Sequence, residues 1–88
     1  MNKALIDQLT AEIELLQRAI IRCEDLLAGA IETKHSLWCD IDQIPTEQFH
    51  ADYAKVVADI STFEHDLIDL RTHKRTAEIK LNLVLKYA

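Results

Sequence analysis

The chain has 88 residues, of which 49% are apolar and 28% are charged, a composition typical of one small soluble domain. A single glycine, a single proline and five aromatic residues leave too little turn chemistry for a β-sandwich or a β-barrel. The net charge of −5 argues against binding of a nucleic-acid backbone by the domain as a whole. We therefore expect a single all-α domain over residues 1–88 that does not bind nucleic acid directly.

The N-terminal segment and the cysteines bear on location. Asp7 and Gln8 interrupt the first ten residues, so this segment lacks the apolar core of a secretory signal peptide. The longest apolar run covers residues 26–31, whereas a membrane-spanning helix needs about 20 apolar residues. Cys23 and Cys39 match neither a disulfide framework nor a redox motif. These features predict a cytoplasmic protein with two free thiols and no membrane segment.

The first predicted element is a long amphipathic helix over about residues 3–38. Its apolar residues recur at alternating steps of three and four, which is the coiled-coil repeat. The series runs Ile6, Leu9, Ile13, Leu16, Ile20, Cys23, Leu27, Ala30, Lys34 and Leu37, with Lys34 as its one polar break. Gly29 lies in the middle of this segment, where it costs about 1 kcal/mol relative to alanine and could kink the helix.

A turn is predicted over residues 39–46. Asp40 and Asp42 favour a turn, Pro45 restricts the residue before it, and Thr46 is a candidate helix cap. A turn this short makes the flanking helices antiparallel neighbours.

The second predicted helix covers about residues 46–86. Its series runs Phe49, Tyr53, Val56, Ile60, Phe63, Leu67, Leu70, Lys74, Ala77, Leu81, Val84 and Ala88. Residues 79–87 also alternate with a period of two, so an extended strand remains an alternative for the tail. The helix is favoured there because Leu81 and Val84 continue the repeat.

The two series match when they are folded about the turn. Leu37 pairs with Phe49, and further along Lys34 pairs with Tyr53 and Cys23 with Phe63, the two position numbers of each pair adding up to 86 or 87. We therefore expect an antiparallel two-helix hairpin, coiled-coil-like and about 50 Å long.

Apolar residues also lie beside this predicted seam, and we expect them to bind a partner. They comprise Leu5, Leu15, Ala19 and Leu26 on one flank, Ile31, Val57, Ile68 and Leu85 on the other, and Trp38 near the turn. A stripe wider than the seam favours dimerisation into a four-helix bundle. The alternative is a scatter of ordinary surface apolar residues. Trp38 is either an anchor exposed together with Ile41 and Ile44 or a cap over Leu37 and Phe49.

An acidic stripe repeats every seven residues as Asp52, Asp59 and Asp66, on the flank of Ala19 and Leu26. Such a stripe suits a basic partner or serves as a solubilising surface. The charge is segregated along the chain, with a net −5 over residues 45–70 and +4 over residues 71–88.

No catalytic signature or cofactor motif occurs in the sequence, so we expect a protein that is not an enzyme. His35 and Cys39 are one helical turn apart, and His50 or Asp40 could join them as zinc ligands. An ordinary polar helix end explains the same residues, and we assign no metal site.

The pattern as a whole predicts a protein–protein interaction module, an adaptor or a small chaperone-like protein, that binds itself as a homodimer or another protein through its apolar flanks. The alternative is an acidic inhibitor that blocks a basic surface of a target, including a nucleic-acid-binding one.

Overall fold

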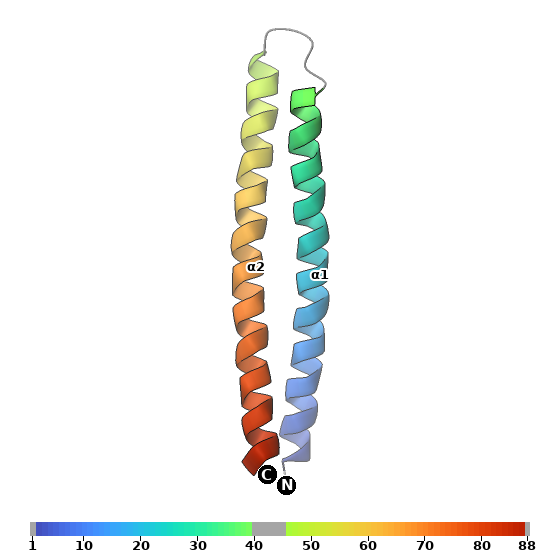
Figure 1. The fold of residues 1–88 in the computed structure, drawn as a ribbon, viewed down its shortest axis with the longest axis vertical. Helices are drawn as coiled ribbons and strands as arrows, with labels where there is room; N and C mark the ends of the chain where they lie inside the picture. Colours follow the sequence, from blue (N-terminus) through green and yellow to red (C-terminus); the bar gives the residue numbers. More distant parts are fainter. Residues whose placement is uncertain (1, 40–45, 88) are drawn as a thin grey trace.

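The structure, a computed structural model, describes residues 2–39 and 46–87. Within these residues the chain forms two helices and no strand: α1 spans Lys3–Cys39 and α2 spans Glu47–Tyr87. The helices are antiparallel and lie side by side along their length (Figure 1). This arrangement confirms the all-α hairpin expected from the sequence. The tail is helical through Tyr87, and the alternative of an extended strand is wrong.

The helix ends lie close to the expected positions 3–38 and 46–86, with α1 ending one residue later and α2 shifted by one residue at both ends. Residues 40–45, on which most of the predicted turn chemistry depends, lie outside the described residues. Thr46 caps α2 as predicted, because its Oγ1 accepts a hydrogen bond of 3.2 Å from the backbone N–H of Phe49. Glu47 in the first turn and Lys86 in the last turn complement the helix dipole.

The seam between the helices follows both predicted series. Every member of the two series within the described residues is buried or half-buried, including the two lysines. The most buried residues are Leu9, Ile20, Cys23, Leu67 and Ala77. Ile20, Cys23 and Leu67 form one cluster, against which Leu27, Phe63 and Leu70 pack.

Contacts between paired residues show the register of the hairpin. Cys23 Sγ donates a hydrogen bond of 3.4 Å to the backbone carbonyl of Phe63. The Lys34 ammonium lies 5.9 Å from the centroid of the Tyr53 ring, within range of a cation–π interaction. Both contacts join residues that the sequence pairs across the turn, so the predicted register is confirmed at these two levels.

The molecule is a thin rod that extends 67 × 15 × 14 Å. The expected length of 50 Å was too short, because a helix of 41 residues, the length both predicted and found for the second helix, rises about 60 Å at 1.5 Å per residue. Helix α1 continues through Gly29, where a β-carbon added to the glycine would meet no atom within 4 Å. Neither described helix contains a stretch long and apolar enough to cross a membrane.

Candidate protein-binding surfaces

The rod has two long faces, one on each side of the seam. Residues that directly precede a seam residue lie on one side, which we call the groove face, and residues that directly follow one lie on the other, which we call the opposite face. On α1 the groove face carries Leu5, Leu15, Ala19 and Leu26, and on α2 it carries Asp52, Asp59, Asp66, His73 and Lys80. The opposite face carries Ile31, Trp38, Val57, Ile68 and Leu85. The predicted partner-binding residues therefore divide between two surfaces.

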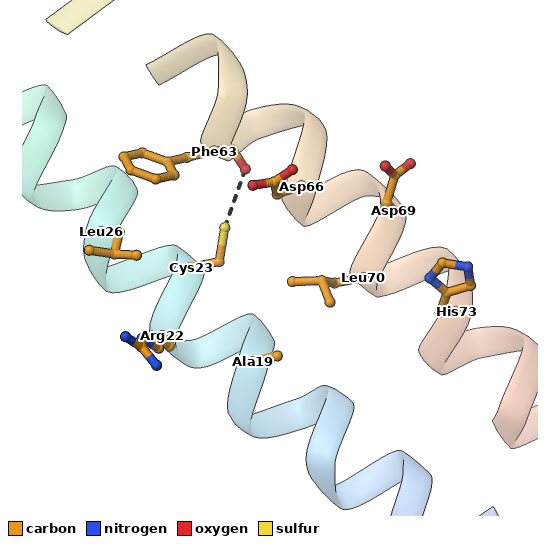
Figure 2. Close-up of a pocket in the computed structure, with 9 residues that line it drawn as sticks. All are labelled: Ala19, Arg22, Cys23, Leu26, Phe63, Asp66, Asp69, Leu70 and His73. Atoms are coloured by element: carbon orange, nitrogen blue, oxygen red, sulfur yellow. Dashed lines mark hydrogen bonds between the residues drawn. The ribbon is translucent and has the colours of Figure 1, made fainter. Parts of the chain in front are cut away.

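The groove face is hollowed near the middle of the rod. An open hollow of about 410 Å³ lies between the helices there and is mostly apolar (Figure 2). Its lining residues are Ala19, Arg22, Cys23 and Leu26 of α1 and Phe63, Asp66, Asp69, Leu70 and His73 of α2. Apolar seam residues form its floor, and charged residues of α2 stand at its margin. This combination suits the apolar stripe of an amphipathic helix.

Further hollows continue along the same face. Toward the chain ends, Leu5, Leu83 and Lys80 border a hollow of about 390 Å³. Toward the turn, Thr33, Asp52 and Asp59 border one of about 300 Å³. Together these depressions form an interrupted groove along most of the rod, and a neighbouring helix could insert side chains into them as knobs into holes.

The acidic stripe borders this groove. Asp66 lies in the same hollow as Ala19 and Leu26, and Asp52 and Asp59 border the hollow nearer the turn. Asp52 accepts a hydrogen bond of 2.8 Å from Gln48 Nε2. Among residues 2–39 and 46–87, Asp59 and Asp66 form no ion pair. Their carboxylates are therefore available to a cation brought by a partner.

The opposite face has exposed apolar residues and an ion pair across the helices. Arg71 and Glu24 approach to 3.9 Å, with both side chains about half exposed. Ile31, Val57, Ile68 and Leu85 are all exposed on this face. An exposed ion pair of this kind contributes about 0–1 kcal/mol to the stability of the hairpin.

Trp38 combines the two roles considered for it. Its ring meets the rings of Phe49 and Tyr53 edge-on, with centroids 5.4 and 5.6 Å apart, and so covers the end of the seam. At the same time 52% of Trp38 is exposed. Ile41 and Ile44, its expected neighbours in an anchor, lie outside the described residues.

No protein-family model, curated protein or solved structure matches this chain.

The zinc ligands considered from the sequence come together only in part. Cys39 Sγ lies 3.3 Å from His35 Nε2 on the exposed surface of α1. Within residues 2–39 and 46–87, no group of three or more His, Cys, Asp or Glu side chains is placed to hold a metal ion, and Asp40 lies outside them. The described pair is a hydrogen-bonded contact at a polar helix end.

The sequence reasoning missed several residues of the groove face. Arg22, Asp69 and His73 line the central hollow, and Leu83 borders the hollow near the chain ends. Each of them directly precedes a seam residue, so the same repeat that predicts the seam also carries the signal for these positions. The positions that directly precede the seam residues on both helices together make up the groove face.

Proposed function

We propose that this chain is a non-enzymatic protein–protein interaction module that binds an amphipathic helix, of its own kind or of another protein, through the groove face. The observation that carries the proposal is the row of hollows along that face with exposed apolar side chains beside it. Leu15 is 64% exposed and Leu26 is 49% exposed. Covering apolar surface of this kind stabilises a complex by about 25 cal/mol per Å².

The thinness of the rod supports the proposal. A two-helix hairpin buries one seam and leaves both faces in water, and small domains of this shape gain stability when a further helix covers a face. The opposite face, with Ile31, Val57 and Trp38, offers a second surface for an adaptor or a chaperone-like protein. We place the protein in the cytoplasm, where reducing conditions keep the exposed Cys39 thiol free.

A photo-crosslinking residue at Leu26 tests the proposal in the cell. Benzoylphenylalanine in place of Leu26 should give an adduct of defined mass after irradiation, because this position borders the groove. The matched control is the same substitution at Asp25, the neighbouring exposed position, which points away from the seam in the helical repeat. Equal adducts from both positions, or none from Leu26, would contradict the proposal.

An acidic inhibitor is the second candidate function, and the position of the acidic stripe favours it. Asp59 and Asp66 lie on the groove face and form no ion pair within the described residues. A basic protein would satisfy these carboxylates while it covers the apolar floor.

Replacing Asp52, Asp59 and Asp66 together by asparagine tests this second function. If the Leu26 adduct contains a basic protein, the triple variant should lose that adduct while its helical circular dichroism is unchanged. An adduct with a basic protein that survives the triple substitution would exclude the inhibitor function.

A further inference from the structure

We propose that the occupant of the groove face is a second copy of this chain, docked antiparallel across a twofold axis near Gln17 and Leu70. This inference rests on the proposed function, because it names the partner helix for the same groove. The two turns would then lie at opposite ends of a four-helix bundle, with α1 against α1 and α2 against α2.

The distribution of charge along α2 favours the antiparallel arrangement of the two copies. Residues 45–70 carry a net charge of −5, and residues 71–88 carry +4. A parallel pair of rods would bring the two acidic segments to the same end, where they repel each other. An antiparallel pair lays the acidic segment of each copy along the basic segment of the other.

One register places an acidic groove-face residue of α2 opposite a basic one, and a second acidic residue opposite a histidine. In an antiparallel pair with a twofold axis, the position numbers of facing residues on equivalent helices have a constant sum. With the axis near Leu70, Asp59 faces Lys80 of the second copy, and Asp66 faces His73 of the second copy.

The same axis is also suitable for α1. The hairpin register places Gln17 level with residues 69 and 70, so the axis passes α1 near Gln17. Glu12 then faces Arg22 of the second copy, and Leu15 faces Ala19. A single twofold axis therefore pairs complementary residues on both helices of the groove face.

The charges that this dimer would pair are unsatisfied within the described chain. The ion pairs found there are Arg71 with Glu24 and Lys74 with Glu78, and neither belongs to the groove face. Asp59, Lys80 and Glu12 form none among the described residues. A second copy supplies each of them with a counter-charge.

The size of the contact is that of a stable interface. The axis lies about four residues from the middle of the rod, so two copies overlap over about 55 Å of their length. With a rod width of about 15 Å, the contact covers about 800 Å² of each copy, which is the area of a standard protein–protein interface.

Sedimentation equilibrium of charge-reversed variants tests the arrangement. The full chain should be a dimer, and Asp59→Lys and Lys80→Asp should each raise the dimer Kd about tenfold, because each puts like charges opposite each other twice. The double variant D59K/K80D should restore the wild-type Kd. Residues 59 and 80 of one copy lie about 30 Å apart along α2, so only a contact between copies can explain the restoration.

Asp69 provides a variant with the opposite expected sign. Asp69 lies within one residue of the axis, so the Asp69 carboxylates of the two copies lie close together and repel each other. Asp69→Asn removes this repulsion and should lower the dimer Kd about threefold. Helical circular dichroism of all variants confirms folding. A monomer at every concentration, or a dimer in which D59K/K80D fails to restore the Kd, would overturn this inference. A monomer whose Leu26 adduct contains a different protein would overturn it while leaving the proposed function intact.

Discussion

Few residues stabilise the hairpin, and each therefore matters. The buried apolar residues of the described chain come from one layer between two helices, with Leu67 at 4% exposed in the central cluster. In such a thin core, only side chains of the two helices surround the cavity that a truncated side chain leaves.

Leu67→Ala should lower the free energy of unfolding by about 2–4 kcal/mol, since it removes a buried side chain from the cluster with Ile20 and Cys23. Urea unfolding followed by circular dichroism measures the change. Ile79→Ala is the control, because Ile79 is 50% exposed and should change stability by less than about 0.5 kcal/mol. Equal losses in the two variants would mean that the seam is elsewhere.

Replacing Gly29 should raise the stability of the fold, whereas replacing Leu67 should lower it. The φ of Gly29 is not positive, and a β-carbon there would meet no atom within 4 Å. Gly29→Ala should therefore raise the free energy of unfolding by about 0.5–1 kcal/mol through helix propensity alone. A loss of stability, measured in the same urea titration, would show that α1 is not a regular helix at this position.

The two helices are the part of the structure that the sequence predicts best. A repeat of three and four residues over many turns predicts both the helices and the burial of their seam, because residues at this spacing lie on one side of a helix and that side faces the other helix. The two lysines that interrupt the apolar repeat still occupy seam positions. Lys34 and Lys74 are half-buried in the seam, with their ammonium groups near the Tyr53 ring and the Glu78 carboxylate.

The pairing of the helices can be tested by a disulfide. In a background of Cys23→Ala and Cys39→Ser, Ala30→Cys with Val56→Cys should form a disulfide within one chain under mild oxidation, since both positions are half-buried seam residues at the same level. Electrophoresis without reductant measures the yield. The pair Ala28→Cys with Ala58→Cys lies at the same level on exposed positions and should not form it.

The hollows of the groove face were beyond prediction from the sequence. The repeat tells which residues flank the seam, but a hollow depends on how far each side chain extends and which way it turns. Ala19 has a short side chain and leaves space beside Leu70 and Asp66, whereas Phe63 packs against the buried cluster of the seam. Such volumes follow from the packed side chains rather than from their spacing.

At the scale of the whole molecule, the rod has much surface for its small core. Its extents of 67 × 15 × 14 Å place most residues in contact with solvent. A chain of this shape folds more stably when association covers part of that surface, so folding and association should be coupled.

The coupling predicts that the midpoint of thermal unfolding depends on protein concentration. A hundredfold increase in concentration should raise the Tm by about 5–10 °C, because only the folded form associates. Circular dichroism melts at several concentrations measure this. The variant L15E/L26E, which places charges on the groove face, should melt at one Tm at all concentrations. A wild-type Tm that is independent of concentration would contradict the coupling.

The antiparallel course of the hairpin means that α1 begins and α2 finishes at the same end of the rod (Figure 1). A host protein could therefore carry residues 2–87 as a stalk grafted into one of its surface loops, since the two points of attachment adjoin. The stalk would hold the Trp38, Phe49 and Tyr53 rings at its far tip. Fluorescent proteins fused at both termini should for the same reason show efficient energy transfer, and a fusion at either terminus leaves that tip unobstructed.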